Sequence, residues 1–381
     1  MLGYLDNAAT TPMRPEAIEA MLPFLRERFA NPSGAHLLAR DARRSLDEAR
    51  EVIAATLGAE PGEIVFTSGG TESDNLAVLG AHDQHGGVVA CSAVEHHAVL
   101  DPVISRAGRV VSVDETGVID LEALAEAIGP DTTLVSVMSA NNEIGTIQPL
   151  AEVARVVKTK APAALLHTDG VQAFSWLDVA GLTAVADLVS ISAHKFGGPK
   201  GVGALVVRKG VELAPRQIGG GQERDLRSGT HNLAGIVAMA RAAEVTAETR
   251  DETVARVAAL RDRLIRGLIA TVPGAVETAV GAPKTVGICH ICVDGIESEA
   301  LLYLLEKGGV FASAASSCSS GAMESSHVLA ALGIAHDLAG GSLRLSLGYS
   351  STDADVDLAL EVVPAAVERL RAFSPTVGAR P

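Results

Sequence analysis

The sequence predicts an α/β protein: a large domain with a mostly parallel, helix-flanked sheet, and a smaller C-terminal α+β domain. Short apolar, β-branched runs alternate with helical segments through the first half of the chain, which is the pattern of a parallel sheet. A chain of 381 residues also exceeds one typical hydrophobic core, so a second domain is expected. We expect the large domain at 13–255 and the small domain at 1–12 with 256–381.

The large-domain elements follow from local patterns. Helices are expected at 15–28 and 39–57, and apolar residues recur in the second at Leu46, Ala49 and Ile53. Strands are expected at 63–67, 87–91, 133–138, 164–168, 187–191 and 203–207.

The second part begins with a very long helix. Residues 232–272 are expected to be helical and to bridge the two domains, because this length exceeds one globular helix. The small-domain elements expected after it are a strand at 286–293, a helix from Glu297, a loop over 313–321, a strand at 342–347 and a helix from Asp353 that bends at Pro364.

Composition excludes several classes of partner and location. A formal charge of −15 argues against nucleic acid and against an anionic membrane surface. No stretch reaches the length of a membrane span, and the first residues contain no basic or long apolar leader. Four cysteines do not make a disulfide framework. We therefore expect a cytoplasmic protein with no membrane or nucleic-acid partner.

Lys195 is the first candidate catalytic residue. The strand at 187–191 delivers Ser192, His194 and Lys195 to its carboxyl end, where open α/β sheets bind ligands. A lone lysine at a turn is more often simply exposed. Burial here would favour the neutral amine, which is the form that reacts with an aldehyde.

A phosphate site is predicted close to this lysine. Ser68-Gly69-Gly70-Thr71 stands at a helix start, where backbone N–H groups and the helix dipole attract anions. Gly70 and Thr71 are the expected ligands there, and Ser192 and His194 can add to the cradle.

Four further polar residues suit an aromatic ring. Asp169 ends its own strand and can hold a proton on a pyridine nitrogen, while Gln172 and Asn142 can reach a ring hydroxyl. His96 can stack on the ring. Each signal is weak alone, but an aspartate and a lysine on successive strands make coincidence improbable. A phosphate, an aldehyde and a pyridine nitrogen together describe pyridoxal phosphate.

The chain resembles the cysteine desulfurases of the iron–sulfur-assembly type, in the class V aminotransferase group. The resemblance implies an aminotransferase-like large domain, pyridoxal phosphate, conversion of L-cysteine to L-alanine, a homodimer, and a sulfur-acceptor protein such as an iron–sulfur scaffold. The motifs that carry it are Tyr4–Pro12, Ser68–Asn75, Glu95–Leu100, Asn141–Thr146, His167–Asp169, Ser192–Lys195, Gly219–Arg224, Arg227–Thr230 and Arg344–Gly348.

The resemblance also implies roles for individual residues. Thr230 is implied as a phosphate ligand that reaches across a homodimer, and Arg344 as the clamp on the substrate carboxylate. Asn7 and Asn142 are implied substrate-binding residues, and His96 is implied as catalytic beside Lys195. No metal is expected.

Cys318 is the expected sulfur-handling residue. It lies in Ser316-Ser317-Cys318-Ser319-Ser320, a run of small polar residues, whereas Cys91 ends a predicted strand. A thiolate attacks sulfur readily and stores the product reversibly as a persulfide. Cys289 and Cys292 match the spacing of a metal or redox pair, but residues three apart on a strand face opposite sides, so we expect core cysteines.

Rival functions remain open at this point. A selenocysteine lyase or an aminotransferase would use the same scaffold, and transamination needs no thiol. A non-catalytic protein of the same fold would not need Lys195, Asp169, His96 and Cys318 together. A nucleotide-binding protein is poorly supported because no G-x-G-x-x-G follows the first strand.

Overall fold

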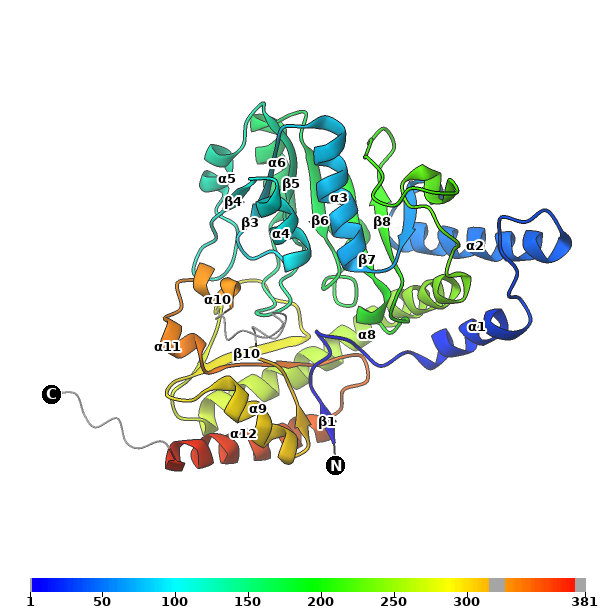
Figure 1. Ribbon diagram of the computed structural model, residues 1–381. Coiled ribbons are helices and arrows are strands. Elements are labelled where there is room, and N and C mark those ends of the chain that lie inside the picture. Colours follow the sequence, from blue (N-terminus) through cyan, green and yellow to red (C-terminus); the bar gives the residue numbers. More distant parts are fainter. Residues whose placement is uncertain (1, 315–325, 374–381) are drawn as a thin grey trace.

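The computed structural model describes residues 2–314 and 326–373, and its elements are labelled in Figure 1. The helices are α1 (Pro15–Arg26), α2 (Leu37–Thr56), α3 (Gly70–His85), α4 (His97–Ser105), α5 (Leu121–Ala127), α6 (Leu150–Lys160), α7 (Val179–Leu182), α8 (Leu233–Thr271), α9 (Ser298–Lys307), α10 (His327–Ala331), α11 (His336–Ala339) and α12 (Asp353–Phe373). The strands are β1 (Gly3–Tyr4), β2 (Ile64–Thr67), β3 (Val88–Ser92), β4 (Arg109–Val111), β5 (Thr132–Ser136), β6 (Leu165–Asp169), β7 (Leu188–Ser192), β8 (Gly203–Val207), β9 (Ala275–Glu277), β10 (Ile288–Val293), β11 (Val310–Phe311) and β12 (Ser342–Ser346).

The large sheet has the strand order β2-β8-β7-β6-β5-β3-β4. The strands from β7 to β4 are parallel to one another, and β8 runs antiparallel to both of its neighbours. The expectation of a mostly parallel sheet is therefore confirmed. Every residue of β7 and β8 is buried, as expected for strands with helices on both faces.

Alternate residues of each strand supply two separate apolar layers. Along β8, Ala204 and Val206 join the cluster formed with α1, α2 and the first half of α8. Leu205 and Val207 join the cluster formed with α3 and α4 on the other face. The period of two along a strand thus builds both layers from one apolar run.

A second, smaller sheet lies under the large one in Figure 1. Its order is β12-β10-β9, all antiparallel, and β1 pairs with β11 in a separate two-stranded parallel sheet. Leu5 packs in the same apolar cluster as residues of α8, α9, β10 and α12. The first residues of the chain thus lie with its last third.

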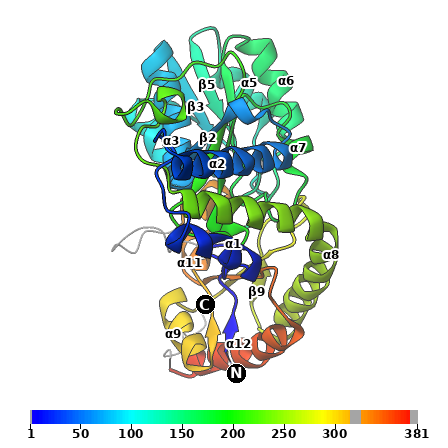
Figure 2. The same cartoon turned by 90° about the vertical axis from the view of Figure 1, so that its right-hand side faces the viewer.

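Helix α8 connects the two parts, and Figure 2 shows it running from beside the large sheet down to the small one. Its observed bounds, Leu233–Thr271, confirm the single long helix expected at 232–272. The Asn232 side chain caps it by accepting the N–H of Gly235 at 3.1 Å. Buried residues from Leu233 to Ala243 pack on the large sheet, and those from Val257 to Leu268 pack on the small one.

Most predicted elements are confirmed with small shifts at their ends. Asp169 and Ser192, expected just after their strands, are the last residues of β6 and β7. Helix α12 continues through Pro364 as one helix. The strands β1, β4, β9 and β11 were missed, because runs of two or three residues carry too little pattern.

Candidate active site

A cavity of about 470 Å³ lies between the carboxyl ends of the large-sheet strands and the small sheet. Most of the residues predicted from the sequence line it, although they come from many separate segments. The lining residues are Asp6, Ala8, Ala9, Gly70, Thr71, Asp74, His96, Met138, Asn142, Asp169, Val171, Gln172, Ser192, His194, Lys195, Ser313 and Arg344.

The N-terminus of α3 forms one wall of the cavity. A Cβ on Gly70 would lie 2.9 Å from Val171 Cγ2, so glycine is needed to seat the first turn against the loop that follows β6. Gly203 of β8 likewise allows a close approach to the turn before α3, since a Cβ at this position would lie 2.8 Å from the Cα of Gly69. The N–H groups of this first turn, with the Thr71 hydroxyl, are donors of the kind that can bind an anion.

Lys195 follows directly from β7 in the short helical turn Ala193–Lys195. Its Nζ donates to the carbonyl oxygen of Ala9 at 2.9 Å and also to that of Ala8. Gln172 Nε2 donates to the Ala8 oxygen as well, at 2.8 Å. The N-terminal segment therefore holds both side chains at the cavity wall.

Asp169 and Asp74 are two buried carboxyl groups of the cavity with raised pKa values. Burial raises the pKa of Asp169 to about 6, and Val171 donates its N–H to Oδ1 at 2.8 Å. Burial and the nearby charge of Asp169 raise the pKa of Asp74 well above its usual range. Each of these carboxyl groups is thus harder to ionise than it would be in water.

His96 and His194 are both neutral at physiological pH. Burial, helped by the charge of Lys195, lowers the pKa of each to about 4. His96 Nδ1 accepts the N–H of Ala98 at 3.0 Å, so the proton of its neutral ring is on Nε2. His194 Nδ1 lies 3.1 Å from Thr10 Oγ1.

Arg344 is the cationic side of the cavity and is only 4% exposed. Its Nη1 donates to the backbone carbonyl oxygen of Asn142 at 3.0 Å, and its Nη2 pairs with Asp6 Oδ1 at 2.9 Å. Nε has no hydrogen-bond partner within the described ranges. Two of its three nitrogens are thus held by the protein, which fixes the guanidinium while leaving N–H groups for an anion.

Two predicted site residues, Asn7 and Thr230, are not among the residues that line the cavity, and a third is not described by the structure. Asn7 is buried, and its Nδ2 donates to the backbone oxygen of Ser346 at 2.9 Å. Thr230 is exposed and also stands away from the cavity of its own chain. Cys318 lies outside the described residues.

Sequence reasoning missed three polar residues of the cavity, Asp6, Asp74 and Ser313. Asp74 lies one helical turn after Gly70, so helical spacing from the phosphate motif was the available signal. Asp6 meets Arg344 across 338 residues, and no local pattern predicts such a pairing.

The remaining described cysteines are thiols of the core. Burial raises the pKa of Cys91 well above its usual range and that of Cys289 and Cys292 to about 12. Cys289 and Cys292 belong to different apolar clusters, which confirms that they face opposite sides of β10.

Over residues 2–314 and 326–373, no group of three His, Cys, Asp or Glu side chains is arranged to hold a metal ion. In the same ranges, no helix combines the length and apolar character needed to cross a bilayer.

Glu95 should make stability depend on pH. It is fully buried beside His96, and its Oε1 accepts the N–H of Met138 at 2.7 Å. Burial raises its pKa to about 8, whereas the unfolded group titrates near 4.5. Between these values only the folded state keeps the proton, so rising pH lowers the free energy of unfolding, by about 1.4 kcal/mol per pH unit for one such group.

We therefore expect Glu95→Gln to flatten the dependence of unfolding free energy on pH between pH 6 and pH 8. Urea unfolding at both pH values measures it. Glu126→Gln, at an exposed position of α5, is the matched control and should keep the wild-type slope. An unchanged slope in Glu95→Gln would contradict the assignment of a protonated Glu95.

Comparison with known proteins places this site in a family. The model of the class-V aminotransferases matches residues 3–359. An IscS-like cysteine desulfurase of Mycobacterium tuberculosis (strain ATCC 25618 / H37Rv) is 45% identical, over 97% of this chain and 97% of its own. The cysteine desulfurase IscS of Methanosarcina thermophila is 43% identical, over 98% of this chain and 93% of its own. Among solved structures, a NifS-like protein superimposes with a TM-score of 0.90 at 37% identity, covering 97% of this chain and 100% of that one. The chain therefore belongs to the class-V aminotransferase family, and within it to the group of the cysteine desulfurases.

Proposed function

We propose that the protein is a pyridoxal-phosphate-dependent cysteine desulfurase, which converts L-cysteine to L-alanine and keeps the sulfur as a persulfide on Cys318. One arrangement carries this proposal: a single cavity brings together the Lys195 amine, the Asp169 carboxylate and the Arg344 guanidinium. The names of the relatives agree with it.

The residues of the cavity fit pyridoxal phosphate. The glycine-dependent first turn of α3, with Thr71, Ser192 and His194, offers neutral and N–H donors to a phosphate. The Asp169 carboxyl lines the same cavity and could hold a proton on the ring nitrogen. Bound there, pyridoxal phosphate would accept electrons from the bonds around the amine-bearing carbon of the substrate.

The side chains then have separate tasks. Lys195 provides the amine that binds the aldehyde and can move a proton at the substrate carbon. His96, with its proton on Nε2, would stack on the ring. Gln172 and Asn142 would hold the ring oxygen. Arg344 binds the substrate carboxylate, and Asn7 supports it by holding the backbone at Ser346.

The Cys318 thiolate attacks the sulfur of the bound cysteine. The carbon–sulfur bond breaks, its electron pair remains with carbon, and protonation of that carbon yields L-alanine. The enzyme keeps a persulfide, which it passes to an acceptor such as an iron–sulfur scaffold protein. Incubation with L-cysteine and a thiol reductant should yield alanine and sulfide in equal amounts. Formation of a keto acid without sulfide would favour an aminotransferase instead.

Arg344→Lys should raise the KM for L-cysteine with little change in kcat. A lysine keeps the charge but loses the bidentate geometry, so binding weakens by roughly tenfold. Steady-state kinetics measure both constants. Arg266→Lys on the exposed side of α8 is the control and should match the wild type. A fall in kcat with unchanged KM would contradict a binding role.

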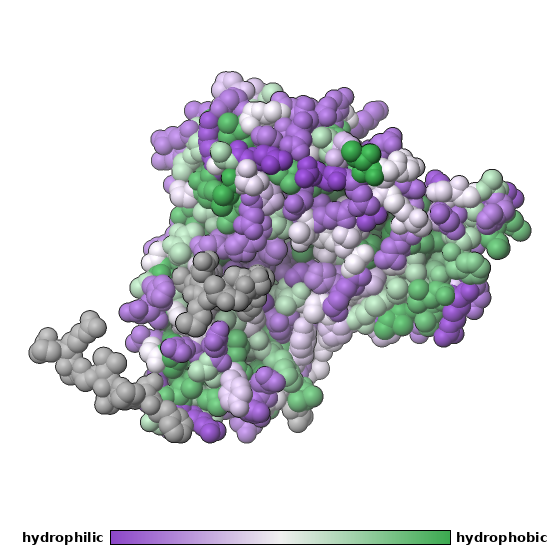
Figure 3. Space-filling view, viewed as in Figure 1, coloured by the Kyte–Doolittle hydropathy of each residue, from purple (hydrophilic) through white to green (hydrophobic). Residues whose placement is uncertain are grey.

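We further propose a homodimer with two shared sites, in which Thr230 of each subunit contributes to the partner's phosphate site. Thr230 is exposed and does not line its own cavity, which supports a role in the other subunit. Figure 3 shows an apolar area over the arm formed by α1 and α2. The exposed apolar residues there are Ile18, Leu22, Leu25, Phe29, Leu37 and Leu38. Light scattering should find a dimer under assay conditions, and an active monomer would contradict it.

The division into domains at 13–255 and at 1–12 with 256–381 is also a proposal. The separate apolar clusters of the two sheets support it.

We also propose a reducing, cytoplasmic location, which the unpaired thiols at Cys91, Cys289 and Cys292 support.

A further inference from the structure

The segment before Thr230 has an unusual backbone. Three consecutive residues, Glu223, Arg224 and Asp225, have φ values of +48°, +58° and +64°, the left-handed region that side chains rarely adopt. None of them is glycine. Such a conformation persists only where the surrounding contacts fix it, and it is found preferentially at functional sites.

One buried carboxylate provides those contacts. The Glu223 side chain is 2% exposed, and Arg50 of α2 binds it bidentately, at 2.6 and 2.9 Å. Phe66 of β2 donates its N–H at 2.8 Å, and His231 Nε2 lies 2.7 Å from Oε1. Burial alone would raise the pKa of Glu223, but the hydrogen bonds from Arg50 and His231 lower it to about 2. Glu223 is therefore an anion at any physiological pH.

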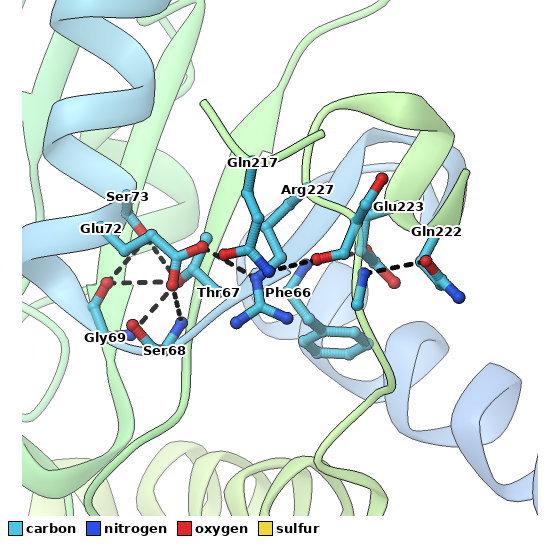
Figure 4. A network of polar contacts seen from close by, with 12 residues as sticks. Phe66, Thr67, Ser68, Gly69, Glu72, Ser73, Gln217, Gln222, Glu223 and Arg227 are labelled. Atoms are coloured by element: carbon cyan, nitrogen blue, oxygen red, sulfur yellow. Dashed lines mark hydrogen bonds and ion pairs between the residues drawn. The ribbon is translucent and has the colours of Figure 1, made fainter. Parts of the chain in front are cut away.

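Hydrogen bonds and an ion pair also hold other residues of the segment 217–231, as Figure 4 shows. Gln222 Oε1 accepts the N–H of Gly229 at 2.8 Å. Arg227 Nε donates to Glu72 Oε1 at 2.8 Å, and Glu72 belongs to the first turn of α3, next to Thr71. The segment is thus held on both sides of Glu223, while Thr230 at its end remains exposed.

A fixed segment with an exposed end is suited to act on another molecule. We propose that Glu223 is a positioning residue for the partner's site: with Arg50, it holds segment 217–231 in the conformation that presents Thr230 to the phosphate bound by the neighbouring subunit. This rests on the proposed function, in which Thr230 is shared between subunits. The effect of Glu223 then belongs to the opposite subunit, whereas a residue that only stabilises its own chain would affect its own site.

Heterodimers made by co-expression with two tags separate these cases. Pyridoxal phosphate joined to a lysine amine absorbs at a longer wavelength than the free aldehyde. Lys195→Ala removes this absorbance from one site, so the remaining absorbing site can be titrated alone with pyridoxal phosphate. In the first pairing, one subunit carries Lys195→Ala and the other Glu223→Gln. Its absorbing site receives an intact segment from the partner and should bind the cofactor as the wild type does.

In the second pairing, one subunit carries both substitutions and the other is wild type. The absorbing site now receives the altered segment. Its dissociation constant for pyridoxal phosphate should be roughly tenfold higher, because the charge-assisted contact of Thr230 with the phosphate is lost. The opposite pattern, or equal weakening in both pairings, would overturn the proposal.

Three further variants make the outcome specific. Thr230→Ala in the same two pairings tests the shared site itself: if the pairings do not differ, the shared site fails and this inference with it. If Thr230→Ala distinguishes the pairings and Glu223→Gln does not, the inference alone fails. Arg50→Lys loses the bidentate pair with Glu223 and should give the same difference between the two pairings as Glu223→Gln, but a smaller one. If the Glu223→Gln chain does not fold, Arg50→Lys takes its place in the experiment. Glu51→Gln, at the exposed neighbour of Arg50, should leave both pairings at the wild-type value.

Discussion

Cys318→Ala should bind pyridoxal phosphate and L-cysteine as the wild type does, and yet release almost no sulfide. Alanine cannot attack sulfur or store it, so we expect the rate to fall on the order of a thousandfold or more, as for other catalytic nucleophiles. The assay is sulfide and alanine release from L-cysteine. In the wild type, mass spectrometry after cysteine treatment should find one additional sulfur on the peptide that contains Cys318.

Cys91→Ala is the matched control for this result. Its thiol is buried in the large-domain core with a strongly raised pKa, so it is not a nucleophile, and the variant should retain activity. Desulfuration by Cys318→Ala at the wild-type rate would overturn the persulfide mechanism. A thiol-independent lyase or an aminotransferase would then be the better proposal.

Lys195→Ala should abolish both covalent attachment of the cofactor and turnover. Lys195 is the lysine that lines the cavity, and its Nζ lies against the N-terminal segment at the cavity wall. Without its amine, the step that needs proton transfer at the substrate carbon should slow on the order of a thousandfold or more.

Borohydride reduction followed by peptide mapping measures the attachment. The wild type should retain the ring on the peptide that contains Lys195, through a carbon–nitrogen single bond, and the variant should retain none. Lys200→Ala, an exposed lysine of the same loop, should behave as the wild type does. Recovery of the ring on any other lysine of the unmodified enzyme would refute the assignment.

The sequence was sufficient for features that depend on local pattern. Strand β7 was predicted because its residues are apolar and β-branched, and this placed Lys195 at the carboxyl edge of the sheet. The glycines at Gly69 and Gly70 predicted the turn into α3 for a similar reason. In these cases the same short stretch contains both the signal and the residue of interest.

Features that depend on tertiary contacts were not predictable. The stretch from Glu223 to Asp225 contains no glycine, yet its backbone is left-handed, and Arg50, distant in sequence, binds the Glu223 carboxylate. The raised pKa values of Asp74 and Asp169 likewise arise from their common burial. Site assignments drawn from the resemblance, such as Thr230 and Cys318, stay predictions until the variants above are measured.

The continuity of α8 couples the two sides of the candidate site. Its 39 residues extend for about 58 Å along the helix, and it contacts both the turn that carries Lys195 and strand β10, the partner of the strand that carries Arg344. Figure 2 shows the helix curving as it passes from the large sheet to the small one. A continuous helix, rather than a flexible linker, thus connects the two elements. Inserting one residue into its middle would rotate the residues that follow by about 100° and advance them by about 1.5 Å. The spacing between the Lys195 amine and the Arg344 guanidinium therefore depends on the number of residues in α8.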